Sequence, residues 1–270
     1  MPSDPKSLSS SLSPAVEPAP ETASQRYVSR LISIPADIPA STDRYALRFA
    51  GRIGQWMLDV QTRSILGFLS DLPDATVLDV GGGHAQVSPP VVAAGHDVTT
   101  LVSTSSAGER LARVSMGKAS ITVGSVETMP FEDNSFDVVV SVRMLAHVDD
   151  WPAFVAELCR VARKAVIVDF PNARGFNAAT PMFFGAKKRL EGDTRPYACM
   201  GLDEVKAVFD RAGFSVDMHT GQFVLPMALH RMIGRSGTTG VSKALEKLLG
   251  PLSSVYGNPV LLRAVRVPLQ

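Results

Sequence analysis

Three consecutive glycines at the end of an apolar run give this sequence its strongest chemical signal. The run covers residues 76–80 and contains Asp79, and Gly81, Gly82 and Gly83 follow it directly. Glycine lets the backbone take left-handed conformations and approach a ligand closely, whereas three in a row cost a plain turn much conformational entropy. A strand that passes through such a turn into a helix presents backbone N–H groups to a bound nucleotide. We therefore predict a nucleotide-binding turn at this point.

Two classes of nucleotide compete for this turn. A dinucleotide fingerprint requires a glycine at the last position of G-x-G-x-x-G, where this sequence has Gln86. The carboxylate of Asp79, two residues before the first glycine, suits a cofactor with a cationic ammonium group better than it suits a pyrophosphate. Charge therefore favours a nucleoside that carries an amino acid. A nicotinamide-dependent oxidoreductase is the disfavoured alternative.

Two further blocks follow the turn: residues 124–137 read GSVETMPFEDNSFD, and residues 141–148 read SVRMLAHV. Together with Asp79-x-Gly81-x-Gly83 they resemble three successive motifs of the class I methyltransferases. The longer block is similar to that of the type-11 branch, which includes enzymes like the ubiquinone and menaquinone methyltransferases. The resemblance implies S-adenosylmethionine as the cofactor and methyl transfer to a small molecule as the reaction.

The resemblance spans roughly residues 76 to 170 and also implies roles for individual residues. It places the glycines of the turn close to the methionine part of the cofactor, with Asp79 bonding toward the ammonium group. Ser125 and Val126 lie where the family contacts the adenine ring. The backbone around Arg143 lies where the family contacts the methionine end.

Two acids that the resemblance leads us to expect are missing. The family usually ends its second strand with an acid that binds both ribose hydroxyls, but the expected position is Val102, followed by Ser103. The acid on the adenine side is likewise replaced, by Ser125. A charge-assisted hydrogen bond contributes about 1.5–3 kcal/mol, so cofactor affinity falls unless Ser103, Ser105 or a backbone group replaces it. These departures keep open a second hypothesis, a non-catalytic Rossmann-like binding or assembly protein derived from a methyltransferase.

A histidine beyond the fourth predicted strand is the candidate catalytic residue. Methyl transfer from a sulfonium needs little acid–base help, but a hydroxyl acceptor benefits from a base. His147 can take up a proton near neutral pH. The alternative is a structural histidine that holds the loop leading to Asp150.

The segment after the fifth predicted strand, residues 171–200, is too long for a simple connection. It combines several basic side chains with apolar ones, and Lys187, Lys188 and Arg189 are the candidate substrate-binding residues. A basic and apolar lid suits an anionic or lipid-linked acceptor. A solvated basic face on an ordinary lid is the alternative.

The elements that must position these residues alternate between strand and helix. Apolar runs predict seven strands, over 76–80, 97–102, 120–124, 136–142, 165–170, 214–222 and 259–267, with helices between them. This alternation predicts an α/β fold, Rossmann-like and doubly wound, with a mostly parallel seven-stranded sheet. An N-terminal helical segment and a lid insertion after strand five complete the expected architecture.

The chain divides into three parts. Residues 1–24 are rich in serine and proline, which predicts a disordered tail. Residues 25–75 are predicted to form an N-terminal helical lid segment, and residues 76–270 the Rossmann-like domain that includes the substrate lid. Within residues 25–75, apolar residues recur at helical spacing from Asp43 to about Ser70. This spacing predicts one continuous helix with Thr42 or Asp43 as its N-cap.

Composition narrows the classes of partner. The 270 residues are 45% hydrophobic and 20% charged, with a formal net charge of +1, so nucleic acid is not an expected substrate. The two cysteines, Cys159 and Cys199, lie far apart and the histidines lack ligand-like spacing. These features predict a reducing, cytoplasmic compartment and no metal site. No apolar run approaches the ~20 residues that span a bilayer, while peripheral membrane contact and the oligomeric state stay open.

Overall fold

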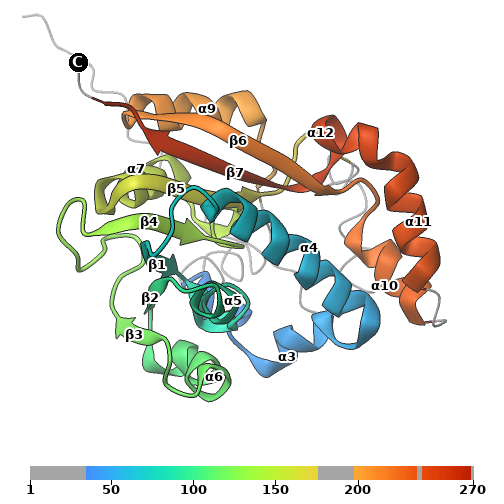
Figure 1. Ribbon diagram of the computed structural model, residues 1–270, viewed down its shortest axis with the longest axis horizontal. Coiled ribbons are helices and arrows are strands. Elements are labelled where there is room, and N and C mark those ends of the chain that lie inside the picture. The colour runs from blue at the N-terminus through green and yellow to red at the C-terminus, as the bar shows by residue number, and fades with distance from the viewer. Residues whose placement is uncertain (1–34, 176–197, 236–238, 269–270) are drawn as a thin grey trace, which may run out of the picture. The chain divides into compact units, whose positions relative to one another are not determined.

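The computed structural model of the chain describes residues 35–175, 198–235 and 239–268. Seven strands form one sheet in the order β3-β2-β1-β4-β5-β7-β6 (Figure 1). The strands are β1 (Thr76–Val80), β2 (Asp97–Val102), β3 (Ser120–Val123), β4 (Phe136–Ser141), β5 (Ala162–Phe170), β6 (Phe214–Phe223) and β7 (Asn258–Arg266).

The sheet is mixed. Strands β1 to β5 pair in parallel, whereas β7 is antiparallel to both β5 and β6. The predicted Rossmann-like fold with seven strands is confirmed, and the reversal is confined to β7, which lies between β5 and β6. Because β1, β2, β3 and β4 run in the same direction, their carboxyl ends meet at one edge of the sheet. This edge is called the carboxyl edge below.

Helices cover both faces of the sheet (Figure 1). One core layer joins α4 (Gly51–Leu69) and α5 (Ser88–Ala93) to the sheet, and the other joins α7 (Trp151–Val161) and α9 (Leu202–Arg211). Successive residues of β1 enter opposite layers, since Val77 packs in the first while Leu78 and Val80 pack in the second. A strand buried on both faces reads as a continuous apolar run, which is why the strands were predictable.

The N-terminal segment contains α2 (Asp37–Ala40), α3 (Asp43–Ala46), the 3-10 turn η1 (Leu47–Phe49) and α4. Thr42 caps α3, because its Oγ1 accepts the backbone N–H of Tyr45 at 3.1 Å. The predicted continuous helix is wrong: the backbone is extended at Ala50 and left-handed at Gly51, where φ is +72°. Glycine adopts that conformation without steric cost, so the chain turns there before α4 begins.

The described residues between β6 and β7 form α10 (Met227–Arg235), α11 (Thr239–Leu249), η5 (Gly250–Leu252) and α12 (Ser253–Tyr256). The first of these helices crosses α4 closely, since a Cβ on Gly234 would lie 2.6 Å from Cγ2 of Ile53. Nε2 of the buried His230 lies 2.8 Å from Oε1 of Glu246, which joins α10 to α11. The helices between β6 and β7 are therefore packed against the N-terminal segment through the contact of α10 with α4.

The described ends of the predicted lid lie beside each other. Asn172 and Met200 form an isolated parallel bridge, and the N–H of Ala198 donates to the carbonyl of Ala146 at 3.0 Å. The segment therefore leaves and returns next to the carboxyl end of β5.

Several predictions fall outside the described residues. They concern the tail over 1–24 and the candidate substrate residues Lys187, Lys188 and Arg189. Within the described ranges, no helix combines the length and the apolar character needed to cross a membrane.

Candidate functional site

The glycine turn follows β1 and continues into the 3-10 turn η2 (Gly82–His84). Gly81 has a left-handed backbone with φ at +76°, and its N–H donates to the carbonyl of Leu101 in β2 at 2.8 Å. A Cβ on Gly81 would lie 2.5 Å from Sδ of Met144, which follows β4. The first glycine is therefore required by both its conformation and its neighbours.

The other two glycines are enclosed by the protein itself. A Cβ on Gly82 would lie 2.0 Å from Oδ2 of Asp79, and one on Gly83 would lie 2.0 Å from the carbonyl oxygen of Ala107. Ala107 belongs to α6 (Ser105–Ser115). On the remaining side, Oγ of Ser41 would lie 2.4 Å from the Cβ of Gly83, so the N-terminal segment rests directly on the turn.

Asp79 is fully buried beneath the turn. Its Oδ2 accepts the hydroxyl of Ser88 at 2.6 Å, and that hydroxyl in turn lies 2.7 Å from Oγ1 of Thr100. Its Oδ1 has no hydrogen-bond partner among the described residues, and burial raises the pKa of the carboxyl to about 6. A buried carboxylate oxygen without a donor is unfavourable. A ligand ammonium group, which the resemblance assigns to Asp79, would remove that cost.

Arg143 connects the end of β4 to three other parts of the molecule. Its backbone has φ at +65°, and its N–H donates to Oδ1 of Asp169 at 2.5 Å. The guanidinium donates to the side-chain oxygens of Gln61 in α4 and Gln86 after the glycine turn, and it lies 4.2 Å from the ring centroid of Phe49. Burial raises the pKa of Asp169 to about 6. Arg143 thus fixes the N-terminal segment over the carboxyl edge.

The end of β2 holds an acid that the sequence analysis missed. Asp37 in α2 is fully buried, and its Oδ2 accepts the backbone N–H of Ser103 at 2.7 Å. Oδ1 of Asp37 and Oγ of Ser103 are both buried without a partner among the described residues. No local pattern could have revealed the contact, because 66 residues separate the two positions.

Val102, the position where an acid was expected, faces the core instead. Its side chain is buried, and one of its methyl carbons would lie 3.5 Å from a Cβ on Gly108 of α6. Three carboxylates, those of Asp37, Asp79 and Asp169, are thus buried around the carboxyl edge. Such a set favours a cationic ligand.

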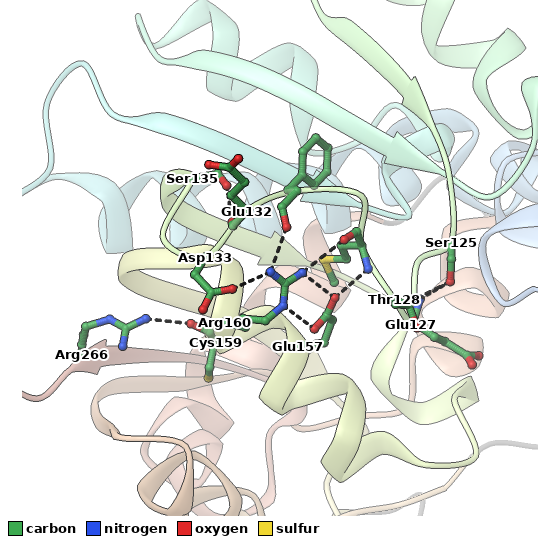
Figure 2. Close-up of polar contacts among 12 residues, drawn as sticks. Ser125, Glu127, Thr128, Glu132, Asp133, Ser135, Glu157, Cys159, Arg160 and Arg266 are labelled. Atoms are coloured by element: carbon green, nitrogen blue, oxygen red, sulfur yellow. Dashed lines mark hydrogen bonds and ion pairs between the residues drawn. The ribbon is translucent and has the colours of Figure 1, made fainter.

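The predicted adenine side begins with a turn after β3, which Figure 2 shows in part. Oγ of Ser125 accepts the N–H groups of Glu127 at 3.2 Å and of Thr128 at 2.9 Å. Ser125 is exposed, and Val126 beside it is buried in the core. The side-chain oxygen of Ser125 therefore stabilises the turn as an acceptor, and its hydroxyl proton can be donated to another group.

Two residues of α7 hold the longer sequence block in place, and neither was predicted (Figure 2). Arg160 donates to the carbonyl of Phe131 and to the carboxylate of Asp133, each at 2.8 Å. Glu157 accepts the N–H of Met129 at 2.7 Å, and its hydrogen bond with Arg160 lowers its pKa. Their spacing of three residues on one helix was a visible signal, but the loop they contact was not.

His147 ends the 3-10 turn η3 (Leu145–His147), and its side chain is half-buried. It follows Ala146, which bonds the returning end of the predicted lid. Asp150, at the end of the loop that follows His147, caps α7 by accepting the N–H of Ala153 at 3.1 Å. Both roles considered for His147 stay predictions. Among the described residues no group of His, Cys, Asp or Glu could hold a metal ion.

The central part of the chain is similar to known proteins. Residues 78–168 match the family model of the methyltransferase domain. No curated protein matches the chain.

Solved structures match most of the chain. Magnesium protoporphyrin IX methyltransferase from Synechocystis PCC 6803, with bound S-adenosylhomocysteine, is 16% identical with a TM-score of 0.58, over 83% of this chain and 94% of that one. Phosphoethanolamine N-methyltransferase 2 of Haemonchus contortus, in complex with phosphomonomethylethanolamine and S-adenosylhomocysteine, is 17% identical with a TM-score of 0.54, over 77% of this chain and 52% of that one. At these identities the likeness shows the fold.

Proposed function

We propose that this chain, which carries a methyltransferase domain of the S-adenosylmethionine-dependent class I type, methylates a small-molecule acceptor. The observation that carries the proposal is the set of unpartnered polar atoms at the carboxyl edge. Asp37, Asp79 and Ser103 each hold a buried oxygen that no described residue bonds. Groups of this kind are rare in folded proteins unless a ligand or water satisfies them.

The residues at this edge fit the methyl donor. Asp79 would hold its ammonium group, Ser125 and Val126 would adjoin the adenine, and Arg143 would adjoin the methionine end. When bound, S-adenosylmethionine supplies an electrophilic methyl group on a sulfonium that departs as a neutral sulfide. The chain's own task is then to align an acceptor with that methyl group and to exclude water, since alignment provides most of the acceleration.

For the acceptor we propose an anionic or lipid-linked compound. The support is the basic cluster Lys187, Lys188 and Arg189 in the segment that follows β5, whose described ends lie at the carboxyl edge. The Haemonchus enzyme similar in fold is bound to a phosphate-bearing compound. For a hydroxyl acceptor, His147 is the proposed base.

Titration calorimetry with S-adenosylmethionine, S-adenosylhomocysteine and NAD tests the proposal. We expect binding of the two adenosyl compounds and none of NAD. A chain that binds neither adenosyl compound would contradict the proposal and favour the non-catalytic assembly protein. Binding of NAD alone would favour an oxidoreductase. A labelled-methyl assay on metabolite extracts, with anionic and neutral fractions compared, then identifies the class of acceptor.

A further inference from the structure

The carboxylate of Asp37 occupies the place at which a ribose-binding acid is expected. In nucleotide-binding α/β sheets this acid lies at the end of the second strand, about 20 residues after the glycine motif. Ser103 directly follows β2 and lies 20 residues after Gly83. Its backbone N–H is bonded by Asp37, which comes from the N-terminal segment. We propose that Asp37 is the acid that binds the ribose hydroxyls of the adenosyl cofactor, an inference that rests on the proposed function.

The two unpartnered atoms at this contact match a ribose. One carboxylate oxygen of Asp37 is engaged by Ser103, while its other oxygen and the Ser103 hydroxyl are buried without partners among the described residues. An unpartnered carboxylate oxygen and an unpartnered hydroxyl, on two residues joined by a hydrogen bond, call for a ligand that both donates and accepts. The adjacent hydroxyls of a ribose do both.

Anchoring of the N-terminal segment does not explain Asp37. The segment is tied to α6 by Asp43, which pairs with Arg110 at 2.6 Å and with Arg113 at 2.7 Å. It is tied to β4 through the guanidinium of Arg143, which bonds Gln61. A structural acid needs no buried oxygen without a partner. Asp37 therefore has an acceptor oxygen to which no described residue donates a hydrogen bond.

The proposal also predicts a coupling between binding and the N-terminal segment. An acid at the end of β2 would be part of the strand and present in every state of the site. An acid on α2 reaches the ribose only when residues 35–46 lie on the glycine turn. Ligand binding should therefore protect these residues, because ligand and segment stabilise each other's position.

Titration calorimetry with S-adenosylhomocysteine tests the inference on the wild-type chain, Asp37→Asn and Asp43→Asn. We expect Asp37→Asn to weaken binding about 10- to 100-fold, as for loss of a charge-assisted hydrogen bond. Asp43→Asn is the matched control, since it loosens the same segment but leaves the ribose acid, and we expect a change within about threefold. The wild type should bind the 2′-deoxy analogue more weakly than S-adenosylhomocysteine. Asp37→Asn should bind the two compounds with nearly equal affinity.

The outcomes separate the two proposals. A wild-type chain that does not bind S-adenosylhomocysteine contradicts the proposed function itself. If the wild type binds but Asp37→Asn binds equally well or more tightly, only the role of Asp37 is wrong, and tighter binding would mean that Asp37 obstructs the site. Equal affinity of the wild type for the ligand and its 2′-deoxy analogue would overturn the inference without any substitution. Hydrogen exchange gives a further readout: the ligand should protect residues 35–46 in the wild type and much less in Asp37→Asn.

Discussion

Buried carboxylates at the two ends of the central strands differ in their hydrogen bonding and in the direction of their pKa shifts. At the amino end, Asp137 accepts both the N–H and the hydroxyl of Thr76 and pairs with Arg163 and Lys164. Although burial acts to raise it, the bonds from Lys164 and Thr76 hold the pKa of Asp137 below its ordinary value. At the carboxyl edge, Asp79 keeps one oxygen without a partner among the described residues, and its pKa rises to about 6.

This difference separates structural from ligand-binding acids within one sheet. A carboxylate whose oxygens are all bonded contributes to folding, whereas one left incomplete weakens the ligand-free fold until a ligand supplies the missing donor. Ligands of open α/β sheets bind outside the carboxyl ends of the strands. The amino end is therefore complete without a ligand, and the carboxyl edge is not.

The largest effect is expected at the glycine turn. Gly83→Ala should destabilise the fold by about 3 kcal/mol or more, because the added carbon would meet the Ala107 carbonyl at 2.0 Å. Thermal and urea unfolding measure the loss. Gly67→Ala in α4 is the control, since no atom lies within 4 Å of its added carbon, and it should stabilise by about 0.5–1 kcal/mol. A stable Gly83→Ala protein would mean that α6 does not close on the turn.

Exchanging the two acids for amides tests the comparison directly. Asp137→Asn should lower the free energy of unfolding by about 1–3 kcal/mol and leave ligand affinity unchanged, because it removes hydrogen bonds to charged partners at the amino end. Asp79→Asn should leave stability equal or higher and weaken S-adenosylhomocysteine binding about tenfold or more. Denaturant unfolding and calorimetry on both variants suffice. If the two variants change alike in stability and in ligand affinity, the distinction between a structural acid and a ligand-binding acid is wrong.

The difference between the two edges should also appear in the pH dependence of the free energy of unfolding. A carboxyl whose pKa is raised by folding, as for Asp79 and Asp169 at about 6, binds more protons folded than unfolded between pH 4 and 6. Stability of the ligand-free chain should therefore fall as pH rises through this window, by on the order of 3 kcal/mol per group. Asp137, with its lowered pKa, acts in the opposite sense and loses its contribution below about pH 4.

Unfolding midpoints measured from pH 3 to 8 check this sign. The slope between pH 4 and 6 should become smaller in Asp79→Asn, which cannot titrate at that position. A wild-type chain whose stability instead increases steadily from pH 4 to 6 would show that these carboxyls are paired in solution.

The smallest effect is expected from the basic cluster. Replacing Lys187, Lys188 and Arg189 together by glutamine should raise the KM for an anionic acceptor about fivefold, since an ion pair in contact with water contributes only about 1 kcal/mol. Affinity for S-adenosylhomocysteine should hold, because the acids of the carboxyl edge determine it. Added salt should weaken the wild type in the same way. Equal KM values for both proteins across a salt series would make the cluster a solvated surface.

Elements defined by local pattern were predictable, and contacts across the chain were not. The fourth strand, predicted over 136–142, is observed over 136–141, because a strand buried on both faces is apolar throughout. The helix expected from Asp43 to Ser70 is broken at Gly51, since helical spacing alone does not report a left-handed residue. Asp37 was missed because its contact with Ser103 depends on how two distant segments pack.

The position of β7 sets the order in which this molecule can be completed during synthesis. Among the described strands, β6 pairs with β7 alone, and β5 has β7 as its outer neighbour. Until residues 258–266 have left the ribosome, β6 has no strand to join and one side of β5 stays open. An open strand edge is prone to pair with other chains. Chains interrupted before residue 258 should therefore aggregate, although they contain the whole of the glycine turn, Asp37 and the carboxyl edge.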